Sequence, residues 1–344
     1  MLKSLDHIIP ISLDGPYHKE TFQRIWLKHF QPNATPLEFD GFQGVSFFKK
    51  GSLPLYANVG ATNTKSVVYR VDSQYNPNKS DKNVFLVYDV PDYLPFDSQN
   101  HVGLQLKSIP QYEGFFCNLT HADTVDTYLN TAISKRSRAK LRNYENRLNK
   151  EFEVRFKMVW GEISMKEYEL LFNQFHTLLV QRFEDKQIVN NNLDPTEWAF
   201  FKEITLPMLH NKEAGLFVTY IQDKPVAITL LNFSDTHAYD VIRVFDIAFS
   251  KYRIGSISIV HQLDWCIRNN FKVLDFSKGY FDYKKRWSTD SYIFHYHIWY
   301  NPKNMVSTLI ANLLALTFKL KYWARKKHLL KTVHKIRYRM GNKP

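Results

Sequence analysis

The feature that most constrains the fold is the order of apolar patterns in the second half of the chain. Two helical patterns come first, and a β-hairpin pattern follows, in which apolar runs flank a polar turn at Asp223 and Lys224. A strand, a helix, a strand, a polar loop and an aromatic strand complete the series. The ranges are 164–183 and 194–211 for the helices, 215–233 for the hairpin, 239–249 for the strand, 256–270 for the helix, and 271–276 and 292–300 for the last strands.

Residues 1 to about 120 carry mixed patterns that point to an α+β fold. A helical pattern at 19–30 is followed by short apolar runs separated by Gly, Pro, Asn and Asp. A chain of 344 residues, 44% of them hydrophobic, can bury a sizeable core, and its length favours two domains or one large one. The expected strands cover 44–50, 65–71, 83–90 and 103–109.

Positive charge is concentrated in two segments of the chain. The net charge is +13, yet ten basic residues and no acidic one lie between Asn304 and the C-terminus. A second cluster, Ser134–Lys150, has seven basic residues and one acid. It belongs to a helical pattern at 120–152, for which Thr120 and Asp123 are candidate N-caps and whose exposed face we expect to be basic. The basicity is therefore local and does not characterise the whole fold.

A phosphate-binding loop is the first candidate site. The strand pattern at 239–249 leads through Lys251, Arg253, Gly255 and Ser256 into the helix. A helix N-terminus presents unpaired N–H groups, Gly255 would let the backbone approach closely, Ser256 could cap the helix, and the two cations add charge. The alternative is an ordinary capped helix, because short motifs of this kind often occur without a ligand.

The stretch "DFSKGYFDYKKRWS", 275–288, is the second candidate site. Asp275 stands at the carboxyl end of the strand at 271–276, where open α/β sheets place ligands. Gly279 allows a sharp exit, after which Tyr283 and Lys284 would return across the cleft and Trp287 would pack beneath the ligand or stack on it. The alternative is a structural ion pair between Asp275 and Lys284, with the two aromatic side chains in the core.

The stretch from Leu216 to Trp287 resembles the CelD-like acyltransferases, a branch of the GNAT (acyl-CoA N-acyltransferase) superfamily often found in polysaccharide-biosynthesis gene clusters. The basic helix "LNTAISKRSRAKLRNYENRL" also resembles the arginine-rich helix that precedes this domain in the family, so the likeness covers about residues 120–300. The segments that carry it are "QDKPVAITL", "VFDIAFSKYRIGS", "IRNNFKVLDF" and "DFSKGYFDYKKRW".

The resemblance implies a GNAT-like mixed sheet flanked by helices and related to the Fem-type double-GNAT fold. It implies an N-terminal GNAT-like lobe at 1–119 and the acyltransferase domain at 120–303, and the charge pattern separately predicts a basic amphipathic helical tail at 304–344. It also implies acetyl-CoA or another acyl-CoA as co-substrate, with direct transfer to an amine and no covalent enzyme intermediate. The family's R-x-x-G-x-G/A loop keeps one glycine here, in "YRIGS".

Acyl transfer to an amine needs a base for the ammonium proton, polarisation of the thioester carbonyl and a proton for the departing thiolate. We expect Asp246 to serve as the base or as the anchor of the substrate amine, because it precedes the cofactor loop. His237 is a second candidate, and the alternative for it is a plain loop histidine. Backbone N–H groups at 245–249 could polarise the carbonyl, and Tyr283 could protonate the thiolate.

Other features limit the cofactors and the location. We expect no metal site, since His295 and His297 share one face of an aromatic strand without a nearby acidic or cysteine ligand. The two cysteines are far apart, and no secretory signal pattern is present, so we expect a cytoplasmic protein. The uncharged run at 305–318 is too short to span a bilayer. With the basic residues after it, this run predicts a helix lying on an anionic membrane at its inner face, or a helix docked on the core.

Three functions follow from these observations. The leading one is a CoA-dependent N-acyltransferase acting on an amino sugar, a glycan or another small amine in polysaccharide or cell-envelope biosynthesis. The second is a Fem-type aminoacyl-tRNA-dependent peptidoglycan aminoacyltransferase. Nucleic acid is the less favoured partner, because the basic clusters lack interleaved aromatic residues. The third is a non-catalytic membrane-peripheral scaffold of the same fold. The acyl group, the acceptor and the oligomeric state are not specified by the sequence.

Overall fold

The computed structural model describes residues 13, 15–94, 103–186 and 190–327, and the chain divides into two compact units. We call the described residues within 13–114 and 291–327 the N-terminal unit, and those within 115–290 the central unit. Both units contain β-strands with helices packed beside them, and the predicted α+β class is confirmed. The expected three-part division at 119/120 and 303/304 stays a prediction.

The N-terminal unit contains five consecutive sheet strands, in the order β2-β3-β5-β12-β6. β3 and β5 are parallel, with Leu55 opposite Val84, whereas β2 pairs with β3 and β12 with β5 in antiparallel fashion. The elements of this unit are η1 (Pro16–His18), α1 (Glu20–Phe30), β1 (Phe42–Gln43), β2 (Phe47–Lys49), β3 (Leu55–Asn58), β4 (Arg70–Val71), β5 (Val84–Pro91), most of β6 (Gln105–Asn118), β12 (Asp290–Tyr300) and α8 (Met305–Lys326).

Aromatic side chains fill the core of this unit. The rings of Phe42 and Phe85 lie 4.6 Å apart, and the Trp299 indole N–H donates to the hydroxyl of Tyr69 at 2.8 Å. That hydroxyl is also 2.7 Å from Nδ1 of His297, so this buried histidine has a partner inside the core. The strand predicted at 65–71 is mostly wrong, because within this range only Arg70–Val71 forms a strand. The strand β3 was not predicted.

The central unit has the strand order β11-β10-β9-β8-β7. Neighbouring strands are antiparallel from β7 to β10, and β10 and β11 are parallel. The elements are α2 (Val125–Ala132), α3 (Lys135–Glu151), β7 (Val154–Val159), α4 (Met165–Lys186), η2 (Asn191–Leu193), α5 (Pro195–His210), β8 (Ala214–Ile221), β9 (Lys224–Phe233), β10 (His237–Phe245), η3 (Ile247–Tyr252), α6 (Ile254–Arg268), β11 (Val273–Lys278) and α7 (Asp282–Trp287).

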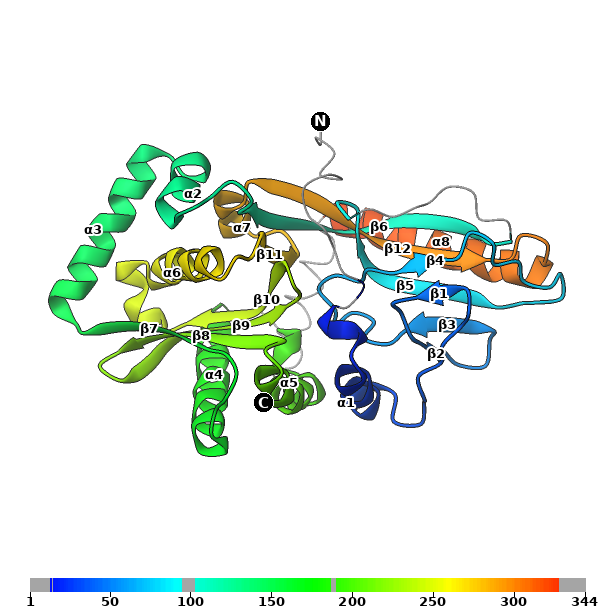
Figure 1. Ribbon diagram of the computed structural model, residues 1–344, viewed down its shortest axis with the longest axis horizontal. Helices are drawn as coiled ribbons and strands as arrows, with labels where there is room; N and C mark the ends of the chain where they lie inside the picture. The colour runs from blue at the N-terminus through cyan, green and yellow to red at the C-terminus, as the bar shows by residue number, and fades with distance from the viewer. Residues whose placement is uncertain (1–12, 14, 95–102, 187–189, 328–344) are drawn as a thin grey trace. The chain divides into compact units, whose positions relative to one another are not determined.

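Helices cover both faces of these central strands. Figure 1 shows α4 and α5 on one side of β7–β10 and α6 on the other. On the α6 side, Leu263, Cys266 and Trp287 are buried in one apolar cluster. The predicted order of helices, hairpin, strand, helix and strand is therefore confirmed for this unit.

The single helix predicted at 120–152 is wrong, because the chain forms two separate helices there. The Thr124 hydroxyl caps α2 by accepting from the N–H of Thr127, and the Ser134 hydroxyl caps α3 by accepting from the N–H of Ser137. Ile133 between them is extended. A serine at this position competes for the backbone N–H and starts a new helix. Neither expected cap is used; the Thr120 side chain instead donates to Asn118.

The strand expected at 239–249 also ends early, at Phe245. The Asp246 carboxylate accepts from the N–H of Ala248 and starts the 3₁₀ turn η3, so the N–H groups after 245 are not those of a strand. Arg253, with φ of +57°, is the N-cap residue of α6. The expected cap at Ser256 is wrong, because this residue lies inside the first turn and its N–H donates to the Arg253 carbonyl.

Candidate active site

The strands β10 and β11 of the central unit separate part of the way along their length. Residues His237–Tyr239 of β10 pair in parallel with Val273–Asp275 of β11. The helix α6 connects the two strands along the chain. The rest of β10, which continues to Phe245, has no pairing with β11 within the described chain. The carboxyl ends of parallel strands are where open sheets bind ligands. We call this opening the β10–β11 fork.

A buried ion pair lies on β10 at the start of the fork. Arg243 donates through Nε to Oδ2 of Asp240 at 2.8 Å, and its Nη2 is 2.7 Å from the same oxygen. The Arg243 guanidinium also donates to Oε1 of Gln262 on α6 at 2.6 Å. Nη1 of Arg243 and Nε2 of Gln262 are buried with no hydrogen-bond partner among the described residues. Two buried N–H donor groups therefore have no partner beside the pair in the described chain.

Three of the predicted site residues gather around this ion pair. The Lys284 ammonium is buried and donates to the carbonyl oxygens of Lys278 at 2.7 Å and Ser277 at 3.3 Å. Burial lowers the pKa of Lys284 to about 8, and the negative charges of Asp240 and Asp275 oppose this shift. Asp275 is fully buried, and its Oδ1 accepts from the N–H of Ser277 at 2.6 Å. Carbonyl groups thus hold the lysine by direct hydrogen bonds, and the carboxylates stabilise its charge.

Tyr283 interacts with the same charges. Burial raises the pKa of its phenol, and the charge of Asp240 raises it further, whereas Arg243 lowers it by its charge and a hydrogen bond. The hydroxyl therefore stays protonated at neutral pH. Tyr283 and Lys284 lie on the short helix α7, which the sequence reading treated as a loop; Gly279 before it has φ of +95°, and the predicted sharp exit is confirmed.

Trp287 lies in the apolar core of the central unit. Its side chain is 1% exposed, and its carbonyl oxygen accepts hydrogen bonds from the Tyr128 hydroxyl at 2.5 Å and the Cys117 thiol at 3.4 Å. These contacts anchor α7 to the core and fix the position of Tyr283 and Lys284. This position fits the alternative given for Trp287, an aromatic side chain of the core, and its contact with a ligand stays a prediction.

The predicted cofactor loop is formed by η3 and the first turn of α6. Lys251 and Arg253 are exposed there, and Gly255 and Ser256 follow in the helix. A Cβ added to Gly255 would lie 2.9 Å from the ring of Phe245, so the glycine permits close packing of the helix on the end of β10. Basic side chains and a helix N-terminus together suit a phosphate group.

The two remaining predicted catalytic residues lie apart from the fork cluster. At about 3.3 Å per residue of strand, Asp246 is roughly 20 Å beyond Asp240, and its carboxylate is 4.0 Å from the Lys224 ammonium. His237 begins β10, at the opposite end of the strand; it is fully buried, and Nδ1 is 2.9 Å from the Thr236 hydroxyl. Burial lowers the pKa of His237 to about 3, so the ring is neutral at neutral pH.

Sequence reasoning missed Asp240, Arg243 and Gln262. A signal was present, since Asp240 and Arg243 are charged residues inside an otherwise apolar strand pattern, and such residues are buried only when they are paired. Gln262 is a buried amide in a largely apolar helix. Within the ranges that the structure describes, no group of three or more His, Cys, Asp or Glu side chains is arranged to hold a metal ion.

Residues 135–285 match the family described as acetyltransferase (GNAT) domain, and this range lies inside the central unit. None of the curated proteins matches the chain in sequence. Among solved structures, the crystal structure of FemX shares 13% identity over 84% of this chain and 96% of its own, with a TM-score of 0.57.

Two further solved structures show weaker likeness. L-PGS from Bacillus licheniformis has 11% identity, covers 88% of this chain and 98% of its own, and has a TM-score of 0.49. A conserved protein of unknown function from Bacteroides thetaiotaomicron has 13% identity, covers 82% and 90%, and has a TM-score of 0.48. The likeness to FemX shows a shared fold. The matched segment indicates that residues 135–285 form a GNAT-type acetyltransferase domain, and this domain supports an acyltransferase.

Proposed function

We propose that the protein is an acyl-CoA-dependent N-acyltransferase, with acetyl as the transferred group, that acts on an amino sugar or another small amine in polysaccharide or cell-envelope biosynthesis. Transfer is direct: the acceptor nitrogen forms a bond to the thioester carbon, the carbon–sulfur bond breaks, the amine loses a proton and the thiolate gains one. The observation that carries the proposal is the buried polar cluster at the β10–β11 fork, inside the segment that matches an acetyltransferase domain.

The fork residues supply the groups that this reaction needs. The unpartnered N–H groups of Arg243 and Gln262 are donors suited to the oxygen of a thioester carbonyl, where negative charge develops. Tyr283 keeps its proton at neutral pH and can give it to the thiolate. Asp275 and Lys284 set the charge around these groups and position the acceptor. Preorganised donors in a buried site act more strongly than they would in water.

The donor molecule is assigned to the loop between β10 and α6. Lys251 and Arg253 would pair with its pyrophosphate, and the backbone at Gly255 and Ser256 would approach it closely. Asp246 would order this loop by accepting a hydrogen bond from the N–H of Ala248, and its distance from the fork leaves the acceptor to Asp275 and Lys284. The assignment to polysaccharide biosynthesis rests on the CelD-like sequence segments.

A second candidate is transfer of an aminoacyl group from aminoacyl-tRNA, as expected for a Fem-type enzyme. The shared fold with FemX favours it. So does the surface of α3, where Lys135, Arg136 and Lys140 are exposed on a helix with a net positive charge. Such a surface could bind RNA phosphates.

The test is a transfer assay in which the release of free CoA thiol is followed with acetyl-CoA and a panel of amino sugars and small amines. We expect acceptor-dependent thiol release, and a loss of about 100-fold or more in kcat for Tyr283→Phe, which removes the proton donor. Tyr280→Phe is the matched control, because Tyr280 is a neighbouring but exposed tyrosine. Failure of the whole panel, together with transfer from aminoacyl-tRNA, would replace this proposal by the second one.

A further inference from the structure

The outer face of α8 carries a continuous apolar stripe. Seven residues on it, with spacings of three and four after the first pair, have side chains between 43% and 88% exposed: Met305, Val306, Leu309, Leu313, Leu316, Leu320 and Trp323. Residues three and four apart lie on one face of an α-helix. Soluble surfaces rarely expose a contiguous apolar patch of this length without a partner for it.

The opposite face of α8 is already occupied by the N-terminal unit. Phe318 stacks on Tyr296, with ring centres 3.9 Å apart and planes 11° apart, and Arg325 lies over the ring of Tyr112 at 3.7 Å. Ala311 and Ala315 are buried against the same unit. The helix is therefore docked on the core through one face, and the stripe is not needed for that docking.

Positive charge flanks the stripe on both sides. Lys319 and Lys321 precede and follow Leu320, so they project to opposite sides of it. Burial lowers the pKa of Lys321, and the positive charges of Arg325 and Lys50 lower it further. From Asn304 onward the sequence contains ten basic residues and no acid.

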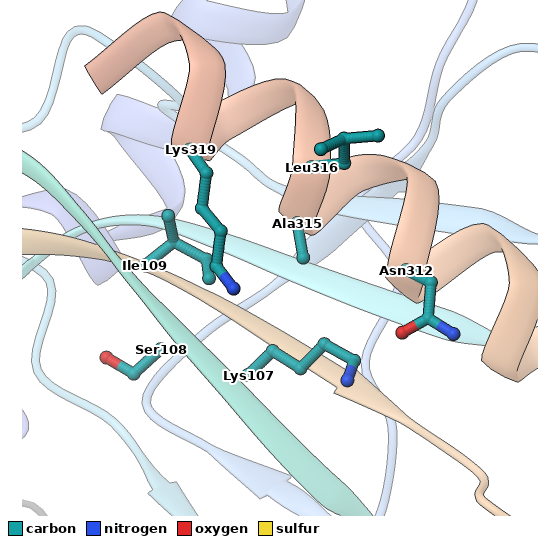
Figure 2. Close-up of a pocket in the computed structure, with 7 residues that line it drawn as sticks. All are labelled: Lys107, Ser108, Ile109, Asn312, Ala315, Leu316 and Lys319. Carbon is teal, nitrogen blue, oxygen red and sulfur yellow. The ribbon is translucent and has the colours of Figure 1, made fainter. Parts of the chain in front are cut away.

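A groove of about 360 Å³ lies beside the stripe, between α8 and β6. Figure 2 shows Lys319 reaching from α8 toward β6, with Lys107 on the strand and Asn312 on the helix. Leu316 belongs both to the lining of this groove and to the stripe. Two ammonium groups and an amide next to an apolar ridge suit a phosphate head group whose acyl chains lie under the helix.

We propose that α8 is a membrane-docking helix that lies flat on an anionic phospholipid surface, with the apolar stripe among the acyl chains and a lipid phosphate between Lys107 and Lys319. A second copy of the chain fits the stripe less well, because two α8 helices would bring their lysines together without any acid on either to pair them. Spanning is not part of the proposal: no helix in the described ranges is long and apolar enough to cross a bilayer.

The proposal is tested by co-sedimentation of the full chain with vesicles of phosphatidylcholine alone and of phosphatidylcholine mixed with phosphatidylglycerol. We expect binding to the anionic vesicles that weakens at high salt, because interactions with the anionic surface are screened. The variants Leu316→Glu with Leu320→Glu, and Lys107→Glu with Lys319→Glu, should each weaken this binding at least about tenfold.

Matched controls change exposed residues of the same kind elsewhere. Leu53→Glu with Leu170→Glu, and Lys166→Glu with Lys285→Glu, should bind the anionic vesicles as the unchanged chain does. Equal binding by the α8 variants and the controls would overturn the proposal. A second result would also overturn it: the unchanged chain does not bind vesicles and forms a dimer, and the double variant Leu316→Glu with Leu320→Glu is a monomer. The stripe would then bind a second copy of the chain. Neither readout depends on acyltransferase activity.

Discussion

Asp240 and Arg243 are three residues apart on β10, yet the carboxylate and the guanidinium meet at 2.7 Å on the same side of the strand. Residues three apart in a regular strand point to opposite faces of the sheet. The register of β10 against β9 shifts between Asp240 and Ile242, and this β-bulge turns the later residues over. The bulge therefore creates the ion pair at the fork, where bulges are often found in enzymes.

Removal of the guanidinium should destabilise the protein strongly. Arg243→Met leaves the Asp240 carboxylate buried without its partner, and we expect the free energy of unfolding to fall by about 3–5 kcal/mol in denaturant titrations. Arg155→Met is the matched control, because Arg155 pairs with Asp223 at an exposed site, where a loss of less than about 1 kcal/mol is expected. Equal losses in the two variants would contradict the buried pair.

Lys284 should make the free energy of unfolding depend on pH in the alkaline range. Its pKa is about 8 in the folded chain, against an ordinary value of 10.5. Between pH 8 and 10.5 the unfolded chain binds more protons than the folded chain, so the free energy of unfolding rises with pH. The contribution of Lys284 to stability is therefore complete above pH 10.5 and is lost as the pH falls to 8. Relative to Lys284→Met, the unchanged protein should gain up to about 3 kcal/mol across this range.

The measurement for Lys284 is a set of denaturant titrations between pH 7.5 and 10. Lys285→Met serves as the control, because Lys285 is the exposed neighbour on the same helix. Its stability should follow that of the unchanged protein at each pH. Parallel profiles for Lys284→Met and the unchanged protein would rule out a burial-lowered lysine.

Gly255→Ala should disturb the packing of α6 on β10. The added methyl group would lie 2.9 Å from the ring of Phe245, and such overpacking typically costs about 1–3 kcal/mol. Thermal unfolding of this variant can be compared with that of Gly15→Ala, where no atom lies within 4 Å of the new Cβ. A Gly255→Ala protein as stable as Gly15→Ala would mean that the helix can move away at no cost.

The sequence predicted the element order of the central unit well because its hairpin, strands and α6 have clear apolar periods. It placed Asp275, Tyr283 and Lys284 in one site, since Asp275 lies at the end of a buried strand and the other two follow that strand. It could not place Asp240 beside Arg243, because a β-bulge depends on pairing with β9 and leaves no period in the sequence. Gln262 was missed because a buried amide is recognisable only by what it contacts.

Local competition explains two of the boundary errors. Ser134 interrupts a helical period that otherwise looks continuous, because its hydroxyl caps a new helix. Asp246 likewise ends β10 by capping a turn inside an apolar run. For the region of α8, the sequence predicted either contact with a membrane or docking on the core. In the described residues, one face of α8 is docked on the core. The part of the predicted tail after residue 327 lies outside the described residues.

The most direct test of the account is calorimetric titration of the purified chain with acetyl-CoA. We predict saturable binding with a Kd of about 1 μM, equivalent to about 8 kcal/mol. Lys251→Glu with Arg253→Glu should abolish this binding, whereas Lys49→Glu with Lys79→Glu, at exposed sites in the N-terminal unit, should preserve it. The absence of binding up to millimolar acetyl-CoA would contradict the account and would favour an aminoacyl-tRNA donor or a scaffold without catalysis.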